Sequence, residues 1–94
     1  MTNLTELETK VLRNWYTNYD DSPETEKQDN CTPMQARDIA AENKISVNSA
    51  KGVAGSLIKK GLIEIVEGDG FDTPDNFWLT NEGIDAVFEA RKGA

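Results

Sequence analysis

Hydrogen-bonding side chains gather at the start of one predicted helix, over residues 47–60. Ser46 precedes this helix, and Asn48, Ser49 and Lys51 fall within its first turns. An asparagine amide can form two hydrogen bonds with adenine, a serine hydroxyl tolerates several bases, and a lysine reaches guanine or phosphate. These residue types at the start of a helix predict contacts with base edges in a DNA groove.

Groups suited to catalysis or to metal binding are few in this chain. It has no histidine and a single cysteine, Cys31, which excludes Ser/His and Cys/His nucleophile pairs and the usual zinc sites. The acidic residues are spread along predicted turns and helix faces, and no pair of them has an apolar setting. We therefore expect no enzyme activity, no metal and no cofactor.

The elements that position these residues can be read from capping signals and apolar spacing. A Thr-x-x-Glu capping box at Thr5 and Glu8 begins a helix over residues 5–19. Its aromatic residues, Trp15, Tyr16 and Tyr19, recur at helical spacing, which favours a place in the core over a role as a stacking platform for bases.

A second helix is predicted from Thr32 to about residue 42. Thr32 is suited to the N-cap, Pro33 to the first turn and Gln35 to the reciprocal cap. The segment between the first two helices, residues 20–31, has no apolar residue before Cys31 and is rich in acids. We expect it to be a solvated, mobile loop, with an acidic docking element as the alternative.

A tight turn over residues 43–45 and the cap Ser46 lead into the helix over residues 47–60. Val47 is expected on its apolar side, together with residues 50, 53, 54, 57 and 58. The outward side holds Asn48, Gly52, Gly55, Ser56 and Lys59. The two glycines indicate either a smooth face for a groove or partner, or close packing against the first helix; the sequence favours neither.

A β-hairpin and a last helix complete the chain. Gly61 is suited to end the third helix, residues 62–66 and 76–79 form two strands, and Thr80 caps a helix over about 81–92. With 94 residues, we expect one domain over 1–94. The N-terminus lacks the basic and apolar regions of a signal peptide, and no apolar run is long enough for a membrane span. We expect a cytoplasmic protein with no membrane partner.

Charge is distributed unevenly along the sequence. The total is −7, yet residues 43–63 hold four lysines and no acid. The basic island coincides with the predicted helix 47–60, and phosphate contact requires local positive potential rather than a positive total. The lysines are Lys44, Lys51, Lys59 and Lys60.

Three short motifs follow one another in the second half of the chain. They are Ile45-Ser46, then LIKKGLI over residues 57–63, then LTNEG over residues 79–83. In this order and spacing they resemble the winged helix-turn-helix superfamily, especially its MarR-like bacterial and phage members. The resemblance implies an α+β fold in which a three-helix helix-turn-helix core carries a β-hairpin wing and a short C-terminal helix.

The resemblance also implies a small transcription regulator that binds double-stranded DNA with the helix 47–60. The candidate contact residues are Thr32, Gln35, Lys44, Ser46, Asn48, Ser49, Lys51, Gly52, Ser56, Lys59 and Lys60. The chain departs from the family in its wing, which carries only acids, and in lacking long terminal helices for dimerisation. We therefore expect no wing contact with DNA, and any homodimer to be weak.

The acidic wing and loop support a second hypothesis. The domain would be an acidic protein-interaction module, such as a phage modulator that docks on the basic surface of a polymerase or a DNA-binding protein without binding DNA itself. The sequence pI near 4.4 suits such a partner.

Overall fold

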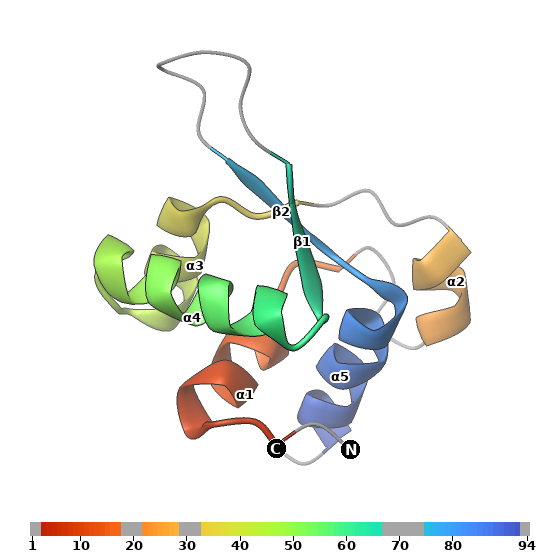
Figure 1. Cartoon of the computed structure of the whole chain (residues 1–94). Coiled ribbons are helices and arrows are strands. Elements are labelled where there is room, and N and C mark those ends of the chain that lie inside the picture. Colours follow the sequence, from red (N-terminus) through yellow and green to blue (C-terminus); the bar gives the residue numbers. More distant parts are fainter. Residues whose placement is uncertain (1–2, 18–21, 29–32, 67–74, 93–94) are drawn as a thin grey trace.

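The chain folds into helices that support a two-stranded hairpin (Figure 1). The computed structural model describes residues 3–17, 22–28, 33–66 and 75–92. Within these ranges the elements are, in order, α1 (Glu6–Arg13), α2 (Pro23–Gln28), α3 (Ala36–Asn43), α4 (Val47–Lys59), β1 (Ile63–Val66), β2 (Asn76–Leu79) and α5 (Asn81–Lys92). The arrangement is α+β and compatible with a winged helix. None of the described helices is long and apolar enough to cross a membrane.

α1 begins at the predicted capping box and ends earlier than predicted. The Thr5 side chain accepts from the Glu8 backbone at 3.1 Å, and Glu8 Oε1 accepts from the Thr5 backbone at 2.7 Å. The helix stops at Arg13 rather than at residue 19, because the Arg91 side chain binds the next carbonyls from outside. Its Nε donates to the Arg13 carbonyl at 3.2 Å and its Nη2 to the Trp15 carbonyl at 2.7 Å.

The aromatic residues after α1 divide between core and surface. Trp15 is buried, as predicted, but Tyr16 is 36% exposed, so its predicted place in the core is wrong. The Tyr16 hydroxyl donates to Glu42 Oε1 at 3.1 Å. Partial burial of the ring and this carboxylate partner both raise the pKa of the Tyr16 hydroxyl. Tyr19 lies outside the described residues.

A short helix, α2, occupies part of the segment predicted as a loop. Ser22 Oγ accepts from the Thr25 backbone at 3.2 Å, and Pro23 begins the helix, where its missing N–H costs nothing. Glu26 is buried, and Lys27 forms an ion pair of 2.8 Å with Asp85 of α5. The loop prediction is therefore wrong for residues 22–28, because contacts with α5 order a segment that has no apolar residue.

α3 begins at Ala36, three residues later than a cap at Thr32 would place it. Gln35 is the N-cap, and its backbone N–H donates to Asp38 Oδ2 at 2.9 Å. Met34 is extended and buried, and it exchanges two backbone hydrogen bonds with Phe77 of β2, at 3.0 and 2.8 Å. Pairing with the sheet thus holds the residues before α3 out of the helix.

The tight turn between α3 and α4 agrees with the prediction. Lys44 ends α3 in the left-handed conformation, with φ of 56°. Ser46 Oγ then accepts from the Ser49 backbone at 3.0 Å and begins α4. Gly61 follows α4 with φ of 75°, a conformation that glycine adopts without a steric cost.

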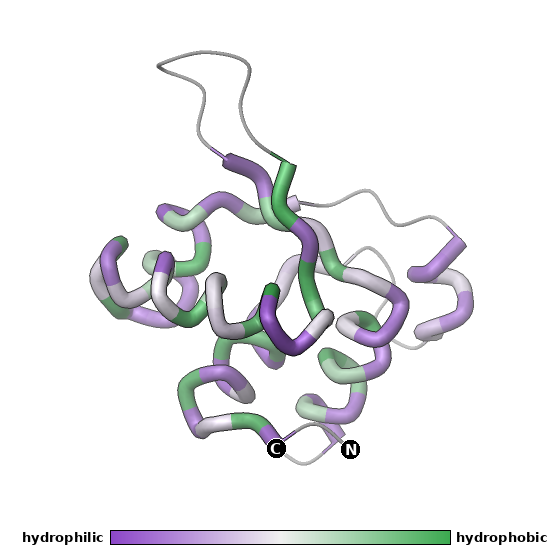
Figure 2. Tube along the Cα trace, in the orientation of Figure 1, coloured by the Kyte–Doolittle hydropathy of each residue, from purple (hydrophilic) through white to green (hydrophobic). Residues whose placement is uncertain are grey.

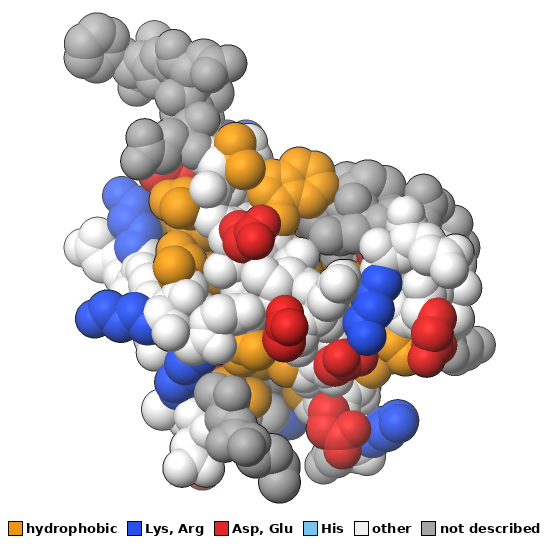
Figure 3. Space-filling model, turned by 45° about the vertical axis from the view of Figure 1, so that its right-hand side comes forward, with side chains coloured by type: hydrophobic (Ala, Val, Ile, Leu, Met, Phe, Trp, Pro, Cys, Tyr) orange, Lys and Arg blue, Asp and Glu red, His pale blue; other side chains and the backbone are white. Residues whose placement is uncertain are grey.

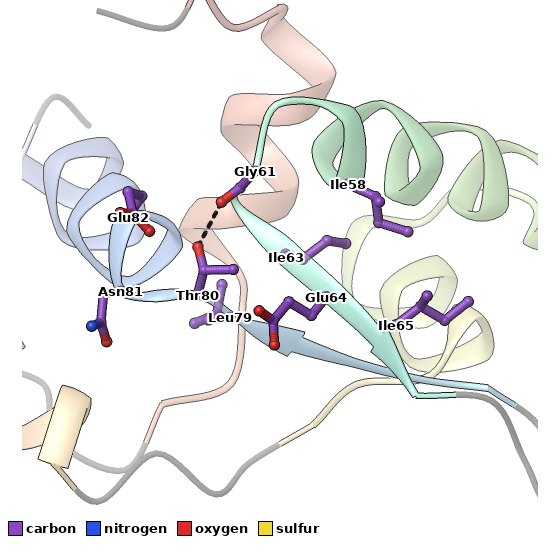
Figure 4. Close-up of a pocket in the computed structure, with 9 residues that line it drawn as sticks. All are labelled: Ile58, Gly61, Ile63, Glu64, Ile65, Leu79, Thr80, Asn81 and Glu82. Carbon is purple, nitrogen blue, oxygen red and sulfur yellow. Dashed lines mark hydrogen bonds between the residues drawn. The ribbon is translucent and has the colours of Figure 1, made fainter.

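The hairpin contacts α5 through the Thr80 side chain and through the close approach of Gly83 to Leu62. Thr80 Oγ1 donates to the Gly61 carbonyl at 2.7 Å (Figure 4) and accepts from the Gly83 backbone at 3.0 Å. The strands pair antiparallel, with Ile63 opposite Leu79 and Ile65 opposite Phe77. A Cβ at Gly83 would overlap the Leu62 carbonyl, so only glycine allows α5 to pass this close to the residue before β1.

One hydrophobic core lies between the helices and the inner face of the hairpin. Figure 2 shows hydrophobic and hydrophilic residues alternating along the helices, as expected for elements with one buried face. Ile84, Val87 and Phe88 of α5 are buried, as are the apolar residues of α4 at 50, 53, 54 and 57. Val47 is 44% exposed, so its predicted place on the inner side of α4 is wrong.

Candidate functional site

The outward side of α4 is a ridge with little side-chain bulk. We call it the α4 ridge and define it by Asn48, Lys51, Gly52, Gly55 and Lys59, which recur at helical spacing. Gly55 is half-buried, and the other members are exposed. A Cβ added at Gly52 or Gly55 would meet no heavy atom within 4 Å. Packing against α1 therefore does not explain these glycines, and the α4 backbone is open to an approaching surface.

Three lysines of the basic segment are exposed on or near α4: Lys44, Lys51 and Lys59. The ion pairs found within the described residues, Lys27–Asp85 and Lys60–Glu8, involve none of them. Their charges are therefore not neutralised by the described part of the molecule. This gives the surface around α4 a positive character within a chain of net charge −7.

Ser56 and Lys60, which the sequence also predicted as DNA contacts, face α1 instead. Lys60 Nζ lies 2.5 Å from Glu8 Oε1 and donates to the Asn3 carbonyl at 2.8 Å. Ser56 Oγ donates to Glu8 Oε2 at 2.6 Å. The prediction that Ser56 belongs to the outward side is wrong, because both residues satisfy a buried carboxylate and hold α4 against α1.

The ionisation of Glu8 reflects these contacts. Its side chain is only 2% exposed, and burial alone would raise its pKa. Hydrogen bonds from Lys60, Ser56 and the Thr5 backbone, together with the Lys60 charge, outweigh burial and lower the pKa from 4.5 to about 2. Glu8 is therefore a charged structural residue at neutral pH, and Lys60 is bound to it.

The two serines at the start of α4 bond to each other. Ser46 Oγ donates to Ser49 Oγ at 3.0 Å, in addition to capping the Ser49 backbone. Both residues are exposed. Ser49 Oγ donates no hydrogen bond found within the described ranges, so it can donate to an acceptor outside the chain.

The remaining nominated residues lie away from the α4 ridge. Thr32 falls outside the described residues. Gln35 sits between α3 and β2, where its amide nitrogen lies 3.4 Å from Asn76 Oδ1. Its role in the structure is to cap α3, and it lines a groove beside α4 rather than the ridge itself.

Arg37 is a basic residue near α4 that sequence reasoning did not select. It is exposed on α3 and lines the same groove as Lys51. It lies outside the basic segment of residues 43–63, and only the packing of α3 against α4 brings it beside the basic helix. Its position in the first turns of the predicted helix before the tight turn was the signal that could have found it.

The described residues give little support for a metal site or for a site built from the acids of the wing. No group of three or more histidine, cysteine, aspartate or glutamate side chains in these ranges could hold a metal ion. At the hairpin, Glu64 and Asp75 are exposed, whereas the wing acids 67, 69 and 72 fall outside the described ranges.

No protein-family model matches the chain, and no curated protein matches it.

Proposed function

We propose that this protein is a small winged-helix regulator that binds double-stranded DNA with α4. In this proposal α3, the turn at Lys44 and α4 form the helix-turn-helix, and β1 and β2 are the base of the wing. The observation that carries the proposal is the α4 ridge: an exposed helix face with an open backbone at Gly52 and Gly55. A regulator of this kind would act in the cytoplasm of a bacterium, encoded by the cell or by a phage, and without catalysis.

The roles of individual residues follow from their chemistry and their exposure. Asn48, Ser49 and Lys51 are exposed at the N-terminal half of α4, the part that meets base edges in a helix-turn-helix. Lys44 and Lys59 flank this part and are suited to phosphates. Ser46, at the helix N-terminus, can contribute a further phosphate contact.

The charge distribution of the chain determines the salt concentration at which DNA binding can be detected. The total of −7 opposes association at long range, whereas the lysines near α4 favour it at contact. Exposed Glu64 would be repelled by a phosphate backbone, so the proposal includes no wing contact with DNA. We expect weak binding by a single module, strongest at low salt.

Charge reversal on α4 tests the proposal. We expect Lys51→Glu and Lys59→Glu to abolish the binding of fluorescent duplex DNA at low salt, measured by anisotropy, with the thermal unfolding midpoint unchanged. With roughly three phosphate contacts, the wild type should show a log–log salt slope of about −2.7.

The matched control is Lys92→Glu at the exposed end of α5, which changes the total charge equally but lies on another element. Equal losses for Lys92→Glu and Lys51→Glu would mean that only total charge matters, and would contradict binding through α4. No binding by the wild type at tens of micromolar protein would contradict the proposal as a whole.

The exposed acids at the hairpin base favour a second candidate, an acidic module that docks on a basic protein surface. Neutralising Glu64 and Asp75 to glutamine and asparagine separates the two. It should leave DNA binding unchanged or stronger under the first proposal, and should weaken capture of a basic protein under the second.

A further inference from the structure

β1 has one edge that no described strand covers. Met34 exchanges its backbone hydrogen bonds with Phe77, so the N–H and C=O of Phe77 point away from β1. Ile65 is the register partner of Phe77, and hydrogen-bonded and non-hydrogen-bonded pairs alternate along antiparallel strands. The N–H and C=O of Ile65 therefore point away from β2. No described residue bonds to them from the other side.

A groove of about 640 Å³ lies beside this edge, between β1, α3 and α4. Its apolar lining includes Val47, Ile58, Ile65 and Phe77. Val47 and Ile65 are 44% and 41% exposed, and with Ile58 they leave apolar surface open in this groove. Gly55 lines the same groove and adds no side chain to fill it.

The figures show how these side chains are grouped. Figure 4 draws a neighbouring pocket that shares Ile58 and Ile65 with the groove, and there Ile58 of α4 points toward Ile65 of β1, so helix and strand both contribute apolar side chains. In Figure 3, hydrophobic side chains gather at the base of the hairpin, above the helices. The apolar surface and the uncovered strand edge thus lie next to each other.

Charge around the groove favours an acidic occupant. Arg37 and Lys51 both line it, and neither forms an ion pair with a described residue. Asp75 is the single acid in the lining. A segment that places apolar side chains on the floor and a carboxylate near Arg37 and Lys51 would complement both the shape and the charge of the groove.

We propose that this groove binds an extended, acidic and apolar segment of a partner protein, which pairs with β1 as an additional strand. Main-chain hydrogen bonds to Ile65 supply register, and every second side chain of the segment faces the groove, apolar residues over its floor and a carboxylate beside Arg37 and Lys51. The proposal does not depend on DNA binding.

The test uses the full chain, labelled with ¹⁵N, and two pools of short synthetic peptides. In one pool the residues of one strand face are valine, isoleucine or leucine followed by glutamate or aspartate, with threonine at the positions between them; in the other pool lysine replaces the acid. We expect the acidic pool alone to shift the amide signals of Val47, Ile58 and Ile65, and to slow hydrogen exchange at the Ile65 amide. N-methylation of alternate peptide nitrogens should abolish both effects.

Two glycine variants form a matched pair. Gly55→Val fills the groove, whereas Gly52→Val adds the same bulk to the α4 ridge but not to the groove lining. Neither added Cβ meets another heavy atom, so both chains should fold. We expect Gly55→Val to weaken binding of the acidic peptides about tenfold, which corresponds to about 1.4 kcal/mol, and Gly52→Val to leave it unchanged, since only the former puts bulk where the peptide side chains would lie.

The proposal is overturned if the acidic pool causes no shift at millimolar concentration, or if the lysine pool binds equally well. Equal effects of Gly55→Val and Gly52→Val on the peptides would also overturn it. DNA binding should be weakened by both variants, so loss of DNA binding and loss of peptide binding are distinguishable outcomes.

Discussion

Glu8 is a buried carboxylate that joins α1 to α4 through Lys60 and Ser56. Because its pKa is lowered to about 2 in the folded chain, the folded state favours the ionised form. This contribution is fully present above the unfolded pKa of 4.5 and is lost as the pH falls through 2. A shift of this size corresponds to a stabilisation on the order of 3 kcal/mol.

We therefore expect Glu8→Gln to lower the free energy of unfolding at pH 7 by about 3 kcal/mol. Denaturant unfolding at a series of pH values should show the difference from the wild type shrinking between pH 4.5 and 2. Glu6→Gln, at an exposed position of the same helix, should be close to neutral throughout. A Glu8→Gln deficit that stayed constant down to pH 2 would contradict the assigned ionisation.

Local sequence signals identified Glu8 as part of the capping box of α1, but not as the partner of Ser56 and Lys60. The spacing of Thr5 and Glu8 predicted a capping box, which the structure confirms. The partners Ser56 and Lys60 lie 48 and 52 residues away in sequence, and only the packing of α4 against α1 brings them together. Burial of the carboxylate follows from that packing, which no local pattern encodes.

Gly83 is required by close packing, whereas Gly52 lies in open space. Alanine substitutions at these two positions should therefore have opposite effects on stability. Gly83→Ala should destabilise the fold by about 3 kcal/mol, because the new methyl group overlaps the Leu62 carbonyl. Gly52→Ala meets nothing and should stabilise the fold by about 1 kcal/mol through helix propensity. Thermal unfolding measures both changes.

The same Gly52→Ala variant should bind DNA more weakly if its open backbone serves the proposed function. A stabilised variant with unchanged DNA affinity would show that the glycine has no part in binding.

At the scale of elements, the sequence predicted the second half of the chain better than the first. The bounds of β2 and α5 and the caps Ser46 and Thr80 follow from local signals, and the structure confirms them. α2 was missed because it has no apolar periodicity. Ser22 before Pro23 was nevertheless a usable start signal. The start of α3 was predicted too early because pairing of Met34 with Phe77 overrides the local cap.

The contact between α1 and α5 depends on Arg91. Its guanidinium donates to the carbonyls of Arg13 and Trp15 and to the Thr17 hydroxyl, the last at 2.9 Å, and its centre lies 5.6 Å from the Phe88 ring centroid. We expect Arg91→Gln to lower the free energy of unfolding by about 2 kcal/mol, since hydrogen bonds from a charged donor are lost.

The control for Arg91 is Lys92→Gln, which removes the same charge from an exposed neighbour. Chemical denaturation should find the control within about 0.5 kcal/mol of the wild type. Similar losses in both variants would indicate a charge effect rather than the loss of these hydrogen bonds.

At the scale of the whole molecule, the α4 ridge and the groove beside β1 are neighbouring surfaces with different chemistry. The ridge is polar and smooth, whereas the groove is apolar with a basic rim. Lys51 belongs to both. A partner segment in the groove would therefore approach the residues proposed to meet DNA, which offers a route by which a partner could regulate binding.

The candidate site was only partly predictable, because exposure is a property of the assembled molecule. Asn48, Lys51 and Lys59 are exposed as helical periodicity predicted. The groove was not foreseen, since it requires Val47, Ile65 and Arg37 from three separate elements. Nor did any sequence pattern show that the edge of β1 would lack a partner among the described strands.

The most direct test of DNA binding through α4 is an NMR titration of the ¹⁵N-labelled chain with mixed-sequence duplex DNA at low salt. We predict that the largest amide shifts fall on Asn48, Lys51, Gly52 and Lys59, and that added salt reverses them. Shifts confined to α5 or to the hairpin strands, or no shifts at tens of micromolar DNA, would contradict the account.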